Sequence, residues 1–344
     1  MTGRVTSRTR SSARPTQKDI AAAAGVSQAA VSMVLNKAET PSVPTATRER
    51  ILKLAGKLGY QPNHTARILR SARTMMLACI VPDITNPFYP GLVRGLQTTA
   101  APAGYDVLIY DTDGVPEGER RAVGWLQQGR ADGVVGTFFH LTASDLAVVA
   151  RNNLPLVLLG HHDNNLATAP IDSVFIDNDE AAAAMTRLLI RRGHRRIAMI
   201  LAEFGPGRRR ARGYARVMSE AGLTPAFVTD TTYSEEAGAR AMQTILARGG
   251  ERPTAVFGAN DMLAIGAMQA ARDAGLAIPS DIAIVGFDDI PTAKLLGLTT
   301  VRQPEFELGA LAARTLIQRL QPGGLEAPKM NLELKFEIVE RSSA

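Results

Sequence analysis

The run PTQKDIAAAAGVSQAAVSMVLN, residues 15–36, places several hydrogen-bonding side chains at short intervals. A glutamine can donate and accept at once, which matches the N6 and N7 atoms of adenine, and a small or apolar side chain can pack on a thymine methyl group. Hydroxyl side chains can contact phosphate oxygens or cap a helix. The residues of this run with such chemistry are Thr16, Ser27, Gln28, Ala29, Ser32, Met33 and Asn36.

Two short helices are predicted to hold these side chains. Thr16 and Asp19 form the cap-and-carboxylate pattern of a helix start, and Gly25 can adopt the left-handed conformation that ends a helix. Ser27 then caps a second helix. The apolar residues of that helix fall on one face: Ala30, Val31, Val34 and Leu35. The pattern predicts a helix-turn-helix, whose second helix enters the DNA major groove; the alternative is an ordinary helical hairpin.

Within the second helix, Gln28, Ala29 and Met33 are expected to face the bases, because the valines and the leucine already supply the core face. The two serines of the run are expected at phosphates. Asn36 at the helix end either bonds a phosphate or simply ends the helix. Thr16, at the start of the first helix, completes the candidate DNA-contacting set in this run.

The charge of the chain is divided unevenly. Residues 1–75 hold 13 basic and 3 acidic residues, a net charge of +10, whereas the remainder holds 26 basic and 30 acidic residues, a net charge of −4. A basic segment on a mildly acidic body suggests a phosphate-binding head joined to a domain with another role. Residues 1–14 have no apolar pattern and are expected to be a disordered basic tail.

Composition excludes several other classes of protein. No apolar run approaches the roughly 20 residues of a membrane span, and the N-terminus lacks the apolar core of a secretory signal. The only cysteine, Cys79, lies in an apolar run and is expected to be a buried small hydrophobe. These features are typical of a protein of the reducing cytoplasm.

A third helix is expected over Thr45–Leu58, so that a DNA-binding domain would occupy residues 15–62. Residues 63–74 are too few and too basic for a helix that is stable alone, and they are predicted to form a linker. From residue 75 to residue 344, short β-rich runs alternate with amphipathic stretches, which indicates parallel sheets built from βαβ units.

That body is long for one doubly wound sheet, so two lobes are predicted. The first lobe is expected to contain about 75–174 plus 304–322, and the second about 175–303 plus 323–344.

The chain resembles the LacI/GalR family of bacterial transcription repressors. The head matches through KDIAAAAGVSQAAVSMVLN and VPTATRERILKLAGKLGYQPNHTARILR. The body matches through VPDITNPFY, VFIDNDEAA, RRGHRRIAMI, RRRARGY, GANDMLAIGAM, DIAIVGFDD and LTTVRQ. The resemblance implies an all-α helix-turn-helix head and an α/β, two-lobed, periplasmic-binding-protein-like body that holds a small ligand between its lobes.

For the linker, the resemblance implies a specific role in DNA binding. Leu69 matches the family leucine that wedges into the minor groove at the operator centre, where an inserted apolar side chain kinks DNA. Ala66 would let two paired linker helices approach closely, and Arg67 and Arg70 are placed for the groove edge or phosphates. Asn63 belongs to the same candidate set; the alternative is a flexible tether.

For the body, the resemblance implies a polar ligand site. Arg210 matches the family arginine that grips the ligand, and its guanidinium suits paired hydroxyls or a carboxylate. Asp288 and Asn260 follow β-rich runs, where open α/β sheets bind ligands, although each could merely cap the next helix. The remaining candidates are aromatic residues that could stack on a sugar face and a glutamine at a crossover: Phe88, Tyr89, Tyr233 and Gln303.

The sequence therefore favours a cytoplasmic, homodimeric, ligand-responsive repressor that binds operator DNA, with a sugar as its expected effector and no cofactor or metal. A nucleobase-type corepressor is the alternative ligand. A sugar-binding transport protein is disfavoured by the head, and an enzyme is disfavoured because no catalytic constellation is recognisable. No leucine-heptad tail follows the body, so a coiled-coil tetramer is not expected.

Overall fold

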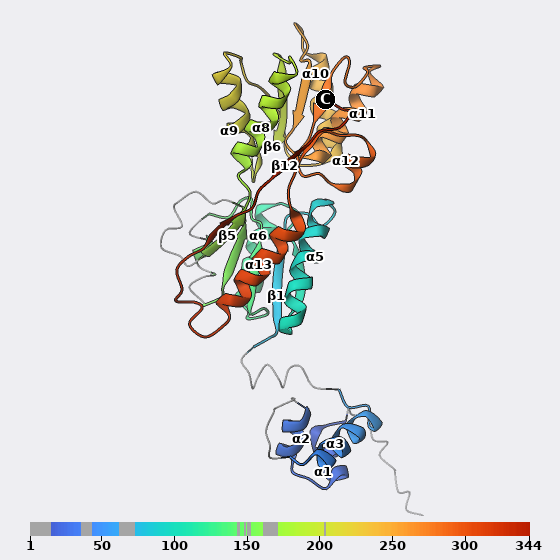
Figure 1. The fold of residues 1–344 in the computed structure, drawn as a ribbon, viewed down its shortest axis with the longest axis vertical. Coiled ribbons are helices and arrows are strands. Elements are labelled where there is room, and N and C mark those ends of the chain that lie inside the picture. Colours follow the sequence, from blue (N-terminus) through green and yellow to red (C-terminus); the bar gives the residue numbers. More distant parts are fainter. Residues whose placement is uncertain are drawn as a thin grey trace, which may run out of the picture. The chain divides into compact units, whose positions relative to one another are not determined.

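The computed structural model describes residues 15–35, 43–61, 73–142, 145–147, 149, 153–160, 171–202 and 204–344. The chain divides into two compact units, 1–73 and 74–344, which we call the head and the body. Figure 1 shows both units.

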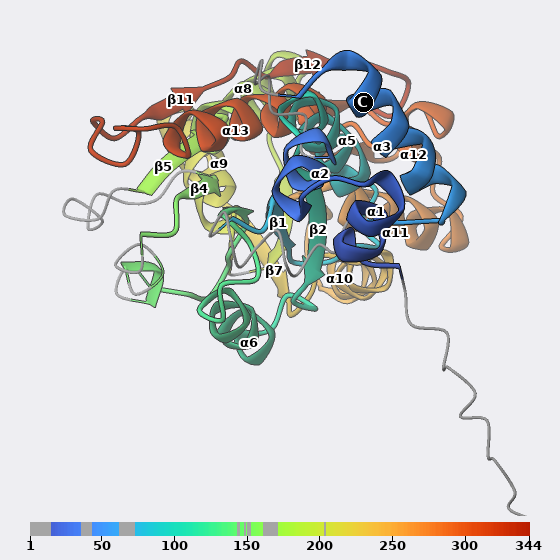
Figure 2. The ribbon, with the colours of Figure 1, turned by 90° about the horizontal axis from the view of Figure 1, so that it is seen from below.

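The head is a cluster of three helices, α1 (Gln17–Ala24), α2 (Gln28–Leu35) and α3 (Thr45–Lys57), which Figure 2 shows from below. Thr16 and Asp19 form a reciprocal capping box at the start of α1, and Gly25 ends this helix with φ at 62°. The apolar faces of all three helices meet in one core: Ile20, Ala21, Ala24, Val31, Val34, Val43, Ile51 and Ala55. The predicted helix-turn-helix is confirmed, and α3 ends one residue earlier than expected.

The first lobe of the body contains a six-stranded parallel sheet in the order β11-β5-β4-β3-β1-β2. Its strands are β1 (Met76–Val81), β2 (Asp106–Asp111), β3 (Gly133–Gly136), β4 (Leu156–Leu159), β5 (Ile171–Phe175) and β11 (Asn331–Glu333). The central strands are apolar along their whole length because the sheet is covered on both faces. The helices α5 (Phe88–Ala100), α6 (Pro116–Leu126) and α13 (Glu305–Arg319) belong to this lobe, with a short 3₁₀ turn at Ala101–Ala103.

Close packing of α13 on α5 depends on glycine. A Cβ atom at Gly309 would lie 1.9 Å from the carbonyl oxygen of Leu92, and one at Gly95 would lie 2.0 Å from the carbonyl oxygen of Phe306. The two helix backbones can therefore touch only because both positions lack a side chain. This contact fixes α13 on the first lobe.

The second lobe contains a four-stranded parallel sheet in the order β7-β6-β8-β9. Its strands are β6 (Ile197–Ala202), β7 (Ala226–Asp230), β8 (Ala255–Gly258) and β9 (Ala283–Val285). Its helices are α8 (Asn178–Arg191), α9 (Gly207–Glu220), α10 (Glu235–Ala247), α11 (Asp261–Asp273) and α12 (Pro291–Leu295). A separate antiparallel pair, β10 (Thr300–Arg302) and β12 (Glu337–Val339), adjoins it. The predicted α/β fold of the body is confirmed.

The chain passes between the lobes three times: between β5 and α8, between β10 and α13, and between β11 and β12 (Figure 1). The assignment of all of residues 323–344 to the second lobe was wrong, because β11 pairs with β5 in the first sheet. A buried ion pair explains the difference. Arg319 of α13 bonds Asp172 of β5 at 2.7 Å and also donates to three backbone carbonyls of residues 324–328, which directs the chain back to β5.

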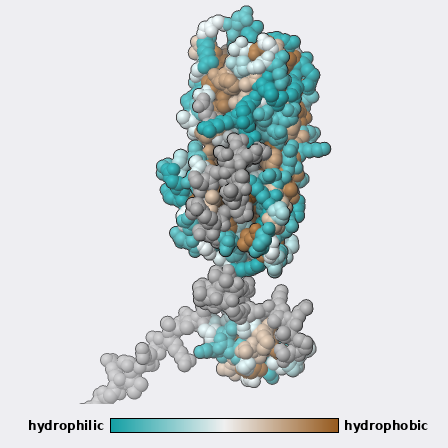
Figure 3. Space-filling model, turned by 90° about the vertical axis from the view of Figure 1, so that its left-hand side faces the viewer, coloured by the Kyte–Doolittle hydropathy of each residue, from teal (hydrophilic) through white to brown (hydrophobic). Residues whose placement is uncertain are grey.

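On the face drawn in Figure 3, hydrophilic residues are interspersed with smaller apolar patches. Among the described residues, no helix has both the length and the apolar character needed to cross a membrane.

Candidate functional site

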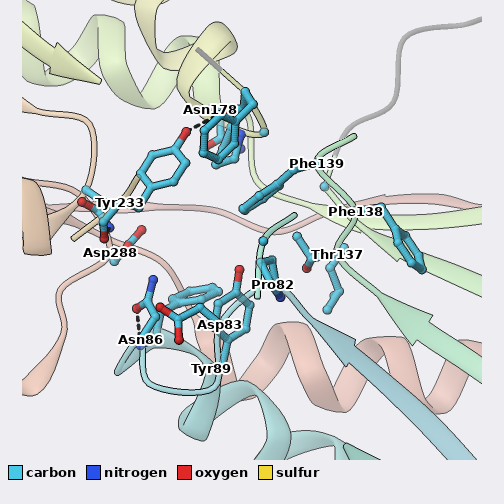
Figure 4. Close-up of a pocket in the computed structure, with 18 of the residues that line it drawn as sticks. Pro82, Asp83, Asn86, Tyr89, Thr137, Phe138, Phe139, Asn178, Tyr233 and Asp288 are labelled. Atoms are coloured by element: carbon cyan, nitrogen blue, oxygen red, sulfur yellow. Dashed lines mark hydrogen bonds between the residues drawn. The ribbon is translucent and has the colours of Figure 1, made fainter. Parts of the chain in front are cut away.

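A cavity of about 1710 Å³ opens between the two lobes of the body (Figure 4). Its walls come from the segments that follow the carboxyl ends of strands in both sheets, as is usual for ligand sites in open α/β proteins. All seven candidate effector-binding residues line this one cavity: Phe88, Tyr89, Arg210, Tyr233, Asn260, Asp288 and Gln303.

Arg210, in the first turn of α9, is nearly fully buried at 3% exposure. Its Nε donates to Asn178 Oδ1 at 2.8 Å and its Nη1 donates to the carbonyl oxygen of Ala259 at 2.6 Å. The guanidinium also lies 3.5 Å from the ring centre of Phe287 and 3.5 Å from Asp288 Oδ1. The arginine that sequence reasoning treated as a fork for the ligand is thus already held by four protein groups.

Asp288 carries a buried carboxylate at the cavity wall. Gln303 Nε2 donates to its Oδ1 at 2.6 Å, and Arg210 approaches the same oxygen. Burial raises the pKa of Asp288 to about 6, and the Arg210 charge opposes this rise. The side chain does not cap the following helix α12, whose start has no side-chain cap.

Behind Asp288 lies a second buried carboxylate, Asp261. It accepts hydrogen bonds from Thr300 Oγ1 at 2.5 Å and from the backbone N–H of Ile290 at 2.9 Å. Burial, and then the nearby Asp288 charge, raise the pKa of Asp261 to about 7. Burial thus raises the pKa of two neighbouring carboxyl groups, of which only Asp288 lines the cavity.

Asn260 has mainly a structural role in this geometry. Its Oδ1 accepts from the backbone N–H of Leu263 at 2.9 Å, which caps α11, and its Nδ2 is 3.5 Å from the carbonyl oxygen of Tyr233. The capping alternative raised for this residue is therefore present in the structure, while the side chain still borders the cavity.

Aromatic rings from both lobes meet at the cavity. Phe139, which follows β3 of the first lobe, lies 5.6 Å from Phe204 and 6.0 Å from Tyr233 of the second lobe, measured between ring centres. The Tyr233 hydroxyl donates to the carbonyl oxygen of Phe204 at 2.7 Å and accepts from the N–H of Gly207 at 2.9 Å. The three rings form an aromatic wall suited to a flat apolar ligand face.

Two aromatic residues that line the cavity begin α5. Tyr89 is buried, and burial raises the pKa of its phenol. Phe88 packs against the cores of both lobes, and its ring meets that of Tyr89 edge-on at 5.2 Å. Figure 4 shows Tyr89 together with Phe139, Tyr233 and Asp288 around the pocket. Phe88 therefore links the two lobes as well as bordering the cavity.

Sequence reasoning missed Phe139, Phe204, Asn178 and Glu119. Glu119 is fully buried in α6 and accepts from the backbone N–H groups of Phe139, His140 and Leu141 at 2.6–3.3 Å. This carboxylate holds the loop that presents the Phe139 ring. The signal available in the sequence was the aromatic pair Phe138 and Phe139, which follows the run GVVG after one intervening threonine, at a strand end.

In the head, Ser27, Gln28 and Ala29 are exposed at the start of α2, and Ser27 Oγ accepts from the N–H of Ala30 at 3.2 Å. Thr16 is exposed at its cap position, whereas Ser32 is half-buried. Met33 is half-buried and packs against the head core, and its contact with the bases stays a prediction. The other candidate DNA contacts lie outside the described residues: Asn36, Asn63, Ala66, Arg67, Leu69 and Arg70.

The fold and the site together define a class of protein. A helix-turn-helix head joined to a two-lobed body with an interlobe cavity is the architecture of a ligand-responsive transcription regulator.

Comparison with known proteins identifies the family. Residues 16–63 match the bacterial regulatory proteins of the lacI family, and residues 186–344 match a periplasmic binding protein-like domain. The chain is 34% identical over 334 residues, 94% of its length and 96% of the relative's, to the HTH-type transcriptional regulator DegA of Bacillus subtilis (strain 168).

Solved structures agree. The lac repressor dimer bound to operator and the anti-inducer ONPF has a TM-score of 0.84 and 26% identity, and the match covers 96% of this chain and 99% of that one. A complex of the transcriptional regulator CelR with cellobiose has a TM-score of 0.69 and 28% identity over 96% and 100% of the two chains. The chain belongs to the LacI family of bacterial regulatory proteins and is a DNA-binding transcriptional regulator.

Proposed function

We propose that this protein is a cytoplasmic, homodimeric repressor whose affinity for operator DNA is controlled by a small ligand bound between the lobes of the body. One observation carries the proposal: seven side chains separated by up to 215 positions in the sequence line a single interlobe cavity. A sugar is the favoured ligand, because carboxylate, guanidinium and amide groups suit hydroxyls and the aromatic wall suits a pyranose face.

The head supplies the contact with DNA in this proposal. Gln28 and Ala29, exposed at the start of α2, would read base edges in the major groove, while Thr16, Ser27 and Ser32 would contact phosphates. Two heads in a dimer would address a pseudo-palindromic operator.

The ligand would act by changing the relative arrangement of the lobes. Three chain crossings connect the lobes, and Phe88 packs on both cores, so a ligand that touches both walls can favour one arrangement over another. The shift is limited to the difference in affinity for the two arrangements. A changed spacing of the linkers, with Leu69 as the minor-groove wedge, would then alter operator affinity.

The aromatic wall favours a second ligand class. The rings of Phe139, Phe204 and Tyr233 would also stack on a planar nucleobase, which would make the ligand a corepressor rather than a sugar effector. A binding protein without a regulatory role is disfavoured by the head. An enzymatic role is disfavoured because the relatives named above are transcriptional regulators.

The proposal is tested by a gel shift on promoter DNA with the full chain, combined with a thermal-shift screen of sugars and nucleobases. We expect specific retardation of the DNA, and a rise in melting temperature with one ligand class that also changes the retardation. A protein that binds no promoter DNA, or a stabilising ligand that leaves DNA affinity unchanged, would contradict it.

A further inference from the structure

The backbone that delivers Asp288 to the cavity is strained. Asp288 has φ at 123° and Asp289 has φ at 61°, so two consecutive non-glycine residues lie in the left-handed region. Such conformations persist only where surrounding contacts enforce them, and they gather at functional sites.

Two arginines hold the carboxylate of Asp289. Arg302 of β10 donates from Nε to Oδ2 at 2.7 Å, and Arg341 donates from Nη2 to Oδ1 at 2.6 Å. The Asp289 side chain is 8% exposed, so these charge-assisted bonds are largely shielded from water. Of the two cations, Arg341 is the better buried, at 14% against 45% exposure.

Arg341 lies in the last five residues of the chain, and this terminal segment is bonded to the strand that leads to Asp288. Ser343 Oγ donates to the carbonyl oxygen of Ile284 at 2.6 Å, and Ile284 N–H donates to the carbonyl of Ser343 at 2.9 Å. Arg341 Nη1 also donates to the carbonyl oxygen of Leu298 at 2.7 Å. The terminal segment is thus fixed to β9 on one side and to the loop before β10 on the other.

On the cavity side, the same loop is held through Asp288 itself. Its N–H donates to the carbonyl oxygen of Val301 at 2.7 Å, and its side chain receives Gln303 and Arg210. The loop is therefore pinned at both of its strained residues, by the terminal arginine on the outer side and by cavity residues on the inner side.

We propose that Arg341, acting through Asp289, is a positioning residue that holds Asp288 in the effector cavity, so that the C-terminal segment is part of the ligand-binding apparatus. This inference rests on the proposed function only in assigning Asp288 to the effector. Arg341 itself does not line the cavity. The alternative is that Arg341 only anchors the C-terminal segment and has no effect on the position of Asp288.

Hydrogen exchange followed by mass spectrometry on the full chain separates the two readings without any ligand. The variants are Arg341→Ala, Asp289→Asn and the conservative Arg341→Lys. The control is Arg192→Ala, because Arg192 pairs with Glu340 and so contacts the same terminal segment without touching Asp289.

We call the pairing of Arg341 with Asp289 the clamp. If the clamp positions the loop, the rate of amide hydrogen exchange in residues 286–290 rises at least about tenfold in Arg341→Ala and in Asp289→Asn. Exchange in β6 and β8 stays within about twofold of wild type, and Arg341→Lys recovers most of the protection. The control variant leaves residues 286–290 unchanged. Should Arg341→Ala prove insoluble, Asp289→Asn decides the matter, because it keeps the arginine and removes only the charge that it binds.

The proposal is overturned if residues 286–290 exchange within about twofold of wild type in both clamp variants, or if only residues 337–344 respond. A uniform rise over the whole second lobe overturns it as well, because that result describes a structural anchor. Failure of the proposed function gives a different result. The clamp variants then change the exchange of residues 286–290 as expected, but no sugar or nucleobase raises the melting temperature of the wild type.

Discussion

Replacing Arg210 by alanine tests the electrostatics of the cavity most directly. The change leaves the Asp288 carboxylate without its cation and removes the donors to Asn178 and Ala259, at a site where the arginine is 3% exposed. Breaking a buried pair by removing one partner costs about 3–5 kcal/mol. For a domain of this size, that loss lowers the melting temperature by about 10 °C.

The size of this loss should depend on pH. In the wild type, burial raises the pKa of Asp288 to about 6 against the opposing charge of Arg210, so without Arg210 the pKa rises further. A carboxyl whose folded-state pKa is raised contributes stability that is present below its ordinary pKa and is lost as pH rises through the folded-state value. At pH 5 the orphaned carboxyl is neutral, so the loss is smaller and comes mainly from the missing donors to Asn178 and Ala259. At pH 8 each further pKa unit adds about 1.4 kcal/mol to the loss.

Urea unfolding of the full chain, followed by far-ultraviolet circular dichroism at pH 5 and pH 8, measures both effects. The matched control is Arg212→Ala on the same helix, because Arg212 is 56% exposed and lies 3.5 Å from Asp179. We expect the control to change the free energy of unfolding by less than about 0.5 kcal/mol.

A second background isolates the pair. When Arg210→Ala is made in the Asp288→Asn variant, it should lower the free energy of unfolding by less than it does in the wild type. The expected coupling free energy is about 0.5–3 kcal/mol. The reasoning is refuted if Arg210→Ala lowers the free energy of unfolding by less than about 1 kcal/mol at pH 8, or by the same amount at pH 5 and pH 8.

Four further outcomes are expected. Arg319→Ala should lower the free energy of unfolding by about 3–5 kcal/mol, whereas Arg314→Ala on the exposed side of α13 should change it by less than about 0.5 kcal/mol, as urea titration will show. Asp261→Asn should remove part of the decline in melting temperature between pH 4 and pH 7, because the raised pKa of about 7 makes the wild type lose stability over that range; an unchanged slope would contradict this. Gly309→Ala should destabilise the body in thermal melts, while Gly124→Ala, with no atom within 4 Å of the added Cβ, should be neutral or stabilising by up to about 1 kcal/mol. Deleting residues 1–73 should leave a folded body that no longer binds promoter DNA in a gel shift, and binding by the full chain should weaken steeply with salt.

The helices of the head and the alternating strands and helices of the body could be predicted because both follow from local sequence patterns. Thr16, Asp19 and Gly25 fix the ends of α1 by chemistry within a few residues. The family resemblance assigned Arg210 to the ligand site, and the rule that ligand sites lie at the carboxyl ends of parallel strands assigned Asp288 to the same site.

What could not be predicted depends on contacts between distant residues. Nothing near Arg319 in the sequence shows that its partner is Asp172, and this pair is what returns β11 to the first sheet. Phe139 and Phe204 lie in loops whose positions are set by a buried carboxylate and by a tyrosine hydroxyl. Such loops have no periodicity from which a position could be inferred.

The way the cavity residues bond one another limits how a ligand can act. Asp288 Oδ1 already accepts from Gln303 and faces Arg210, so a ligand hydroxyl placed at this oxygen must replace a protein hydrogen bond. Replacement gains little free energy, because the bonds lost and the bonds made are of similar strength. The aromatic wall offers a further source of affinity, and its rings come from both lobes: Phe139 belongs to one lobe and Phe204 and Tyr233 to the other. A ligand stacked on that wall gains its free energy only while the rings of both lobes can reach it. Binding and lobe arrangement are therefore coupled through the aromatic rings, and the polar groups determine which ligands fit.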